Sequence, residues 1–218
     1  MKTIKKFLIP LIISVLAFSM QSCLEIVEEI TINEDQSGSM SLSVGVNNAN
    51  SIFGLIGSFT DITFMDDLEM EAEIIVGKLK AQEGISNVKF SKIGNAGKYS
   101  LSFGFNNSKS LNNALYAVNN QKMTIFQPSF YKIKKNKYRR KNITNWANMI
   151  LEKEKENLPD EVIFDLIEYK AVIHLPRQAK LVKAADVVVS QDKKTVGTSN
   201  YISDILNKRI DTGMKIRY

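Results

Sequence analysis

The chain has one cysteine and one histidine in 218 residues. A single cysteine excludes a disulfide bond within the chain, so the fold depends on packing for its stability. The one histidine, His174, has no second histidine or cysteine with which to share a metal ion, and this excludes the common zinc sites. It also lacks the partner that a general acid or base requires. We expect His174 to be a surface residue.

Motifs of catalysis are also missing. The sequence contains no Gly-x-Ser-x-Gly element, no phosphate-binding loop and no zinc-ligand spacing. The adjacent carboxylates Glu28 and Glu29 lie in a predicted strand, where neighbouring side chains point to opposite faces, so they form no acid–base pair. We therefore predict a protein that is not an enzyme and that binds no metal and no cofactor.

The apolar run at the start of the chain is too short to be a membrane span. Phe7 to Met20 is about 14 residues long and contains Pro10, whereas a spanning helix needs about 20 apolar residues. Three lysines precede the run, as in the basic part of a secretory signal. No stretch after residue 23 is apolar for long enough to cross a bilayer. The pattern predicts a signal peptide.

The residues Gln21-Ser22-Cys23 follow this run. In bacterial lipoproteins, the cysteine after the cleavage point carries a diacylglycerol on its thiol, and small residues such as Ser22 precede it. Met20 and Gln21 depart from the strict pattern, so the site resembles the relaxed lipoboxes of Bacteroidetes-type lipoproteins. We expect residues 1–22 to be removed and Cys23 to be lipidated. An uncleaved anchor, or secretion with a free thiol, are the alternatives.

Net charge argues against a nucleic-acid partner. Three of the 29 basic residues lie in the signal, so 26 basic and 23 acidic residues remain, which is a net charge of about +3 instead of +6. Residues 23–218 are enough for one domain with a core, and no linker-like stretch divides them. We expect the protein to reach the membrane through its lipid anchor, in the outer membrane in preference to the inner one.

Alternation of apolar and polar residues predicts several strands. Alternation occurs in Leu24–Asn33, is cleaner in 39–46 and is strongest in 98–105. Further strands are predicted in Val88–Phe90, Met123–Phe126, Phe130–Tyr138, Val162–Leu175, Val187–Ser190, Thr195–Thr198 and Met214–Tyr218.

Helical patterns separate these strands. One helix should begin at Asp66, with Glu69 as its capping-box partner. A second should begin after a cap at Ser108, and the others are predicted in Ile143–Asn157 and Ser203–Asn207. The order predicts an α+β fold: a mainly antiparallel sheet of successive β-hairpins, with three or four helices on one face.

Two groups of side chains are candidates for binding. The aromatic row Tyr99, Leu101, Phe103 and Phe105 either lines a ligand pocket or belongs to the core. A basic run either meets an anionic surface, such as lipid headgroup phosphates, or protects a strand edge. This basic run consists of Lys132, Lys134, Lys135, Lys137, Arg139, Arg140 and Lys141.

Both ends of the domain resemble a known family. Cys23-Leu24-Glu25-Ile26 followed by Thr31–Ser39 is similar to the start of LppM-type lipoprotein domains, and Tyr169, Leu175-Pro176 and Lys194-Thr195-Val196 are similar to their end. The middle, residues 47–160, matches no part of that pattern. The resemblance implies an envelope lipoprotein that handles lipids, and it implies no catalytic residue.

Two functions follow from these observations. The leading hypothesis is a non-enzymatic envelope lipoprotein whose domain binds a lipid or another amphiphile. The alternative is an interaction or scaffolding subunit that docks on an envelope protein complex. A pocket between sheet and helices favours the first, and an exposed apolar patch on a solid core favours the second.

Overall fold

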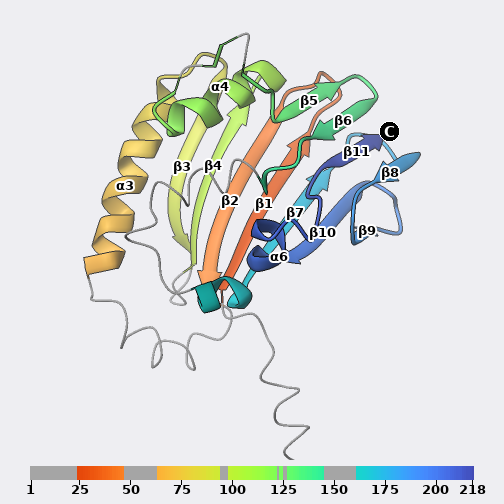
Figure 1. Ribbon diagram of the computed structural model, residues 1–218. Coiled ribbons are helices and arrows are strands. Elements are labelled where there is room, and N and C mark those ends of the chain that lie inside the picture. The colour runs from red at the N-terminus through yellow and green to blue at the C-terminus, as the bar shows by residue number, and fades with distance from the viewer. Residues whose placement is uncertain (1–23, 47–62, 94–97, 122, 125–126, 145–160) are drawn as a thin grey trace, which may run out of the picture.

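The computed structural model of the protein describes residues 24–46, 63–93, 98–121, 123–124, 127–144 and 161–218. The predicted signal peptide and Cys23 lie outside these residues, as does the predicted helix over 143–157 from residue 145 onward. The fold is α+β, as predicted, and it contains two sheets instead of one. Figure 1 shows the larger sheet in the middle of the molecule and the smaller one beside its upper right part.

The larger sheet has seven strands in the order β3-β4-β2-β1-β7-β10-β9. These strands are β1 (Leu24–Ile32), β2 (Gly38–Val46), β3 (Ile85–Ile93), β4 (Lys98–Phe105), β7 (Ile167–His174), β9 (Val187–Val189) and β10 (Thr195–Tyr201). The central pair, β1 and β7, is parallel, with Leu24 opposite Ile167. A parallel pair requires a long crossover, and the chain between β2 and β7 provides it.

The smaller sheet has four antiparallel strands in the order β5-β6-β11-β8. They are β5 (Tyr131–Lys134), β6 (Lys137–Arg140), β8 (Leu181–Lys183) and β11 (Met214–Arg217). The sequence predicted the last strand correctly. It also predicted a pair formed by Met123–Phe126 and Phe130–Tyr138, and this was wrong. Met123 and Thr124 are not in a strand, and the hairpin lies within 131–140.

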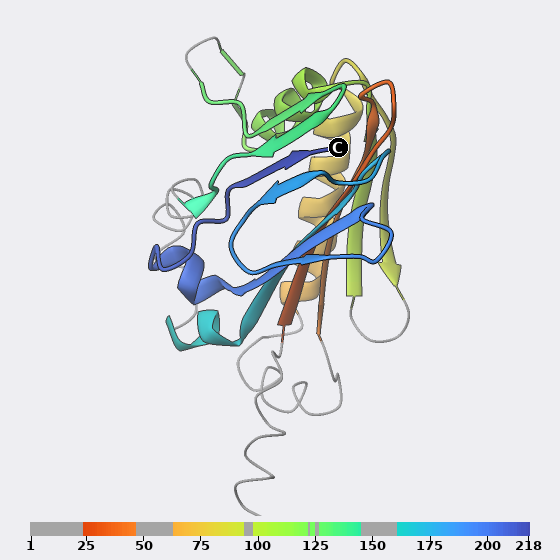
Figure 2. The ribbon, with the colours of Figure 1, turned by 90° about the vertical axis from the view of Figure 1, so that its right-hand side faces the viewer.

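One face of the larger sheet is covered by the helices and by the smaller sheet (Figures 1 and 2). The helices are α3 (Thr63–Lys80), α4 (Ser108–Val118) and α6 (Ile202–Leu206), and a 3₁₀ turn, η1, covers Glu161–Leu166. Ile30 and Phe103 of the larger sheet and Leu111 of α4 belong to the same buried core as Tyr138 and Ile216 of the smaller sheet. The prediction of helices on one face is confirmed, and the smaller sheet shares that face.

The starts of two helices differ from the sequence prediction. Helix α3 begins at Thr63, so Asp66 lies inside the helix and is not its cap. Helix α4 is capped by Asn107, whose side-chain oxygen accepts hydrogen bonds from the backbone of Lys109 (2.9 Å) and Ser110 (3.1 Å). Asn107 is the cap in place of the predicted Ser108, because residue 107 has the extended backbone of an N-cap whereas Ser108 is already the first residue of the helix.

Candidate functional site

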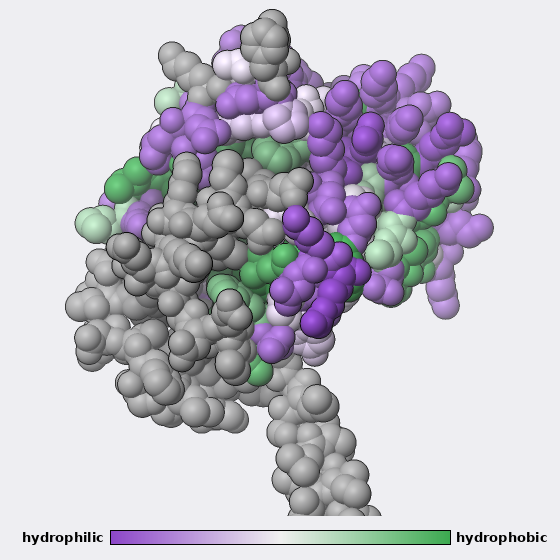
Figure 3. Space-filling view, viewed as in Figure 1, coloured by the Kyte–Doolittle hydropathy of each residue, from purple (hydrophilic) through white to green (hydrophobic). Residues whose placement is uncertain are grey.

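The outward face of the smaller sheet is strongly basic. Its four strands contain eight lysines and arginines and no acidic residue. Along β5, β6 and β11, buried and solvent-accessible side chains alternate, so Tyr131 and Tyr138 point into the core while their neighbours point outward. Seven of the basic residues point outward and form what we name the basic face: Lys132, Lys134, Lys137, Arg139, Lys183, Lys215 and Arg217. In Figure 3, hydrophilic side chains gather in this upper right region.

The register of the strands places these cations directly opposite one another. Lys132 pairs with Arg139, Arg139 with Lys215, and Lys215 with Lys183. The row therefore has one cation on each of the four strands, and with strands about 4.8 Å apart it is roughly 15 Å long. Like charges in opposite positions destabilise a sheet, by about 0.2–1 kcal/mol per pair. Within the described chain, none of the seven forms an ion pair with an acid.

An open groove of about 530 Å³ lies where the pairing of β8 with β11 ends, at Lys183 and Lys215. Besides Arg140, whose charge is paired with Glu28, four cationic residues belong to its lining: Arg139, Lys141, Lys183 and Lys215. The remaining lining residues are Asn142, Ala184, Ala185, Asp211, Gly213 and Met214. The one acid of the lining, Asp211, accepts a hydrogen bond from the backbone N–H of Gly213 (2.8 Å). The groove therefore has an excess of positive charge.

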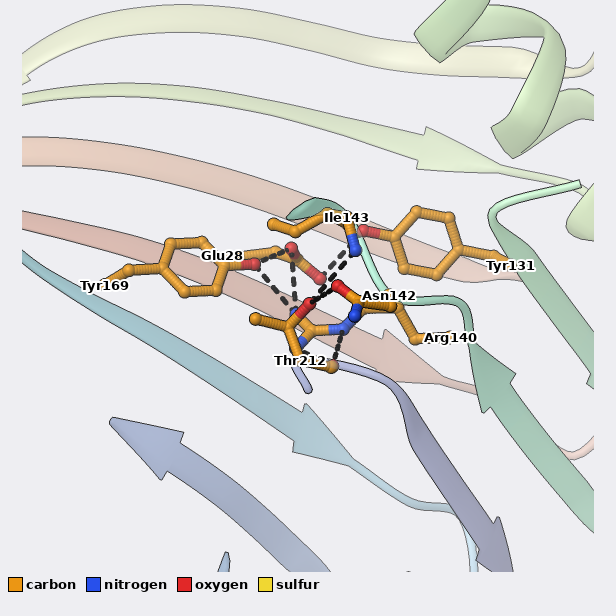
Figure 4. Close-up of polar contacts among 7 residues, drawn as sticks. All are labelled: Glu28, Tyr131, Arg140, Asn142, Ile143, Tyr169 and Thr212. Atoms are coloured by element: carbon orange, nitrogen blue, oxygen red, sulfur yellow. Dashed lines mark hydrogen bonds and ion pairs between the residues drawn. The ribbon is translucent and has the colours of Figure 1, made fainter. Parts of the chain in front are cut away.

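Behind the groove lies a buried ion pair (Figure 4). The Arg140 guanidinium donates through Nη1 to the Glu28 carboxylate at 3.2 Å, and the two residues are only 2 % and 4 % exposed. Tyr131 donates to the other carboxylate oxygen at 2.9 Å, and Tyr169 donates to the same oxygen as Arg140. The Tyr169 hydroxyl in turn accepts a bond of 2.8 Å from Arg140. Every oxygen of the carboxylate thus has a donor.

The same arginine fixes one side of the groove. Its Nε and Nη2 donate to the backbone oxygen of Thr212, at 3.2 and 2.7 Å. The Thr212 hydroxyl donates to Asn142 Oδ1 at 3.0 Å and accepts from the backbone N–H of Ile143 at 3.0 Å. The chain after β6 and the chain before β11 are therefore held together by Arg140 and Thr212.

Burial raises the pKa of the phenols of this cluster. The pKa values of Tyr131, Tyr138 and Tyr169 all lie well above the ordinary value, first because the groups are desolvated and further because the Glu28 charge opposes a second negative charge nearby. The phenols are therefore neutral hydrogen-bond donors at neutral pH. The hydroxyls of Tyr131 and Tyr169 form hydrogen bonds within the cluster. The Tyr138 hydroxyl has no partner among the described residues. This arrangement connects the two sheets.

The predicted basic run is only partly on the basic face. Lys132, Lys134, Lys137 and Arg139 belong to it, Lys135 lies in the exposed turn of the hairpin, and Lys141 lines the groove. Including Arg140 was wrong, because its side chain is buried and bound to Glu28. Sequence reasoning missed Lys183, Lys215 and Arg217, which join the face only through the pairing of β8 and β11 with β6.

The aromatic row on β4 lies on the covered side of the larger sheet. Phe103 and Phe105 belong to the core, and Leu101 packs against it. Tyr99 stacks on Phe90 with ring centroids 5.8 Å apart, and its buried hydroxyl has no partner among the described residues. These positions fit the interpretation of the row as core, and the pocket at this row stays a prediction.

The histidine lies on the opposite, uncovered face of the larger sheet. His174 Nε2 is 2.6 Å from Glu29 Oε1, and Nδ1 is 3.2 Å from the Thr195 hydroxyl. Among the described residues, no group of three or more histidine, cysteine or acidic side chains is placed to hold a metal ion. In that same part of the chain, no helix has the length and apolarity needed to cross a membrane.

Comparison with solved structures gives a distant likeness. No family model and no curated protein matches the sequence. Among solved structures, the chain is similar to the NMR structure of the Mycobacterium tuberculosis LppM (Rv2171) folded domain. The two share 12% identity over 91% of this chain and 92% of that one, with a TM-score of 0.41. This is a distant structural relationship.

Proposed function

We propose that the protein is a non-enzymatic lipoprotein of the bacterial cell envelope, anchored through Cys23, that binds phosphate-bearing amphiphiles through its basic face. The row of opposed cations carries this proposal. The cations of the row repel one another, and an anionic partner would reduce this repulsion. Each cation near an anionic lipid surface contributes on the order of 1 kcal/mol to binding.

Protection of sheet edges does not account for the basic face. Lysines often keep edge strands from pairing with other chains. Here β5 and β8 are the edges of the smaller sheet, whereas β6 and β11 are its inner strands. Lys137 and Arg139 lie on β6, and Lys215 and Arg217 lie on β11. Four of the seven cations are therefore at positions where edge protection has no purpose.

The groove lies nearer to the anchored end of the larger sheet than the rest of the basic face does. Strand β1 begins at Leu24, directly after Cys23, and Arg140 meets it at Glu28, about 13 Å along an extended strand. The β5–β6 hairpin lies at the opposite, upper end of β1 (Figure 1). Headgroup contact through the whole basic face therefore requires the domain to lie over on the bilayer that holds the Cys23 lipid.

Vesicle binding tests the proposed surface. The mature chain with Cys23→Ser should cosediment with vesicles that contain anionic phospholipid and not with neutral phosphatidylcholine vesicles. Replacing Lys134, Lys137 and Arg217 by Gln should weaken binding about 100-fold, since three contributions of about 1 kcal/mol are removed. The control replaces three exposed lysines elsewhere, Lys80, Lys89 and Lys109, and should bind almost as well as the parent. Equal loss in both triple variants would refute a localised surface.

Metabolic labelling tests the anchor separately. Labelled palmitate should enter the wild-type protein and not the full-length Cys23→Ser variant. A mature protein that retains residues 1–22 would contradict lipidation at Cys23, because cleavage accompanies it.

A second function has support from another surface. Three apolar residues on the terminal strands of the two sheets are exposed: Leu181 of β8 (43 %) and Val188 and Val189 of β9 (72 % and 39 %). Exposed apolar side chains at a sheet edge suit a protein partner that adds a strand. Val188→Lys should abolish such a complex in a cross-linking experiment on intact cells, while leaving vesicle binding unchanged.

A further inference from the structure

We infer that the groove between β6, β8 and β11 is a specific site for a phosphate monoester, such as the terminal phosphate of a lipid headgroup. The inference rests on the proposed function and goes beyond it, because a basic face alone would bind any anionic surface. It assigns the recognition to one place on that face and to one chemical group.

The cations of the groove converge on one volume. Lys215 stands opposite both Arg139 and Lys183, so three cationic side chains start from adjacent positions on three neighbouring strands. Lys141 follows two residues after Arg139 and also lines the groove. A phosphate monoester carries close to two negative charges at neutral pH and three acceptor oxygens, and guanidinium groups bind it through two parallel hydrogen bonds. Its charge and its acceptors match this set better than a phosphodiester or a carboxylate does.

The lining also leaves room for the group that bears the phosphate. A volume of about 530 Å³ is in the range of small-molecule sites. Ala184 and Ala185 contribute only methyl groups. A Cβ atom at Gly213 would lie 2.9 Å from Asp211 Oδ1 and 3.4 Å from the backbone nitrogen of Asn142. A side chain at position 213 would therefore disturb the turn in which the Asp211 carboxylate accepts a hydrogen bond from the backbone N–H of Gly213.

The groove is formed in advance of binding. Arg140 and Thr212 join the two chain segments that carry Asn142 and Gly213, through the hydrogen bonds described above. The ion pair with Glu28 attaches this unit to the larger sheet. A site whose backbone is held by buried bonds loses little conformational freedom on binding, and this favours affinity and selectivity.

The test compares two variants of the mature Cys23→Ser chain that lose the same charge on the same sheet. The groove variant is Lys183→Gln with Lys215→Gln, and the control is Lys134→Gln with Lys137→Gln. Titration with sn-glycerol 3-phosphate should produce saturable NMR shifts at the amides of Asn142 and Gly213. We expect at least tenfold weaker binding by the groove variant and less than a twofold change in the control. Equal weakening of both variants, or no saturable shift in the parent, would overturn the site.

Vesicle experiments separate this inference from the function on which it rests. Vesicles with phosphatidic acid, a monoester, should bind the parent more tightly than vesicles with the same fraction of phosphatidylglycerol, a diester, and only the groove variant should lose the difference. If the parent binds both vesicles equally and ignores glycerol 3-phosphate, the specific site is wrong and the basic surface stands. If it binds glycerol 3-phosphate and no vesicle, the groove takes a free phosphate and the membrane function is wrong.

Discussion

Removing the guanidinium of Arg140 should be among the most damaging single changes in the described part of the protein. In Arg140→Met the Glu28 carboxylate, 4 % exposed, keeps two phenol donors and loses its counter-charge. Breaking a buried pair by removing one partner costs about 3–5 kcal/mol, because an uncompensated charge stays buried. The backbone oxygen of Thr212 also loses its two donors. We therefore expect a loss near the upper end of this range.

Urea unfolding followed by circular dichroism measures this loss. A domain of this size is stable by about 5–15 kcal/mol, so the variant should retain a fold whose stability is much reduced. With a slope of about 2 kcal/mol per molar urea, the midpoint should fall by roughly 2 M. Arg139→Met is the matched control, since it removes the same group from the adjacent residue on the outward side. It should change the free energy of unfolding by less than about 0.5 kcal/mol.

A double-mutant cycle then tests the cause. Glu28→Leu combined with Arg140→Met removes both charges, so it should be more stable than Arg140→Met alone, with a coupling energy of about 2 kcal/mol or more between the two positions. Effects that add to within about 0.5 kcal/mol would refute the ion pair as the reason for the loss. They would mean that Arg140 acts only through packing and through Thr212.

Three further predictions concern the N-cap of helix α4, the loss of stability at acid pH and the hydrophobic core. Asn107→Ala should lower the free energy of unfolding by about 1 kcal/mol, whereas Ser108→Ala should have little effect. A hydrogen bond from Arg177 lowers the pKa of Glu34 below its ordinary value of 4.5, so the stability that this pair adds is present above that pH and is lost as the pH falls through the lowered pKa. When the urea midpoint is measured as a function of pH, the midpoint of Glu34→Gln should therefore fall less steeply at acid pH than that of the parent. Phe103→Ala should cost about 3–5 kcal/mol in urea unfolding and leave vesicle binding unchanged.

Strands and helices with a strong local pattern were predictable from the sequence. Strands β2 and β4 alternate apolar and polar residues over eight or nine positions, and β1 does so apart from Val27 and Glu28; each was predicted within two residues of its observed bounds. The hairpin of β5 and β6 was missed because Lys135-Asn136 forms its turn without the glycine that commonly marks one. The parallel pairing of β1 with β7 depends on contacts between residues far apart in sequence, which no local pattern records.

The basic face also depends on contacts between residues far apart in the sequence. Lys215 is far along the chain from Arg139, and only strand pairing places them opposite each other. The sequence run from Lys132 to Lys141 therefore predicted the nearer half of the face and missed the half on β8 and β11. It also included Arg140, since a count of charges ignores which side of the strand each one takes.

Strand alternation nevertheless contained the signal for the buried pair. Glu28 has the same parity as Ile26 and Ile30, and Arg140 has the same parity as Tyr138, so each charge occupies a position that otherwise faces the core. A single buried charge is very costly, so two opposite charges at such positions favour a direct contact between their strands. Applied to this chain, that rule predicts a contact between β1 and β6, and the ion pair between Glu28 and Arg140 makes that contact.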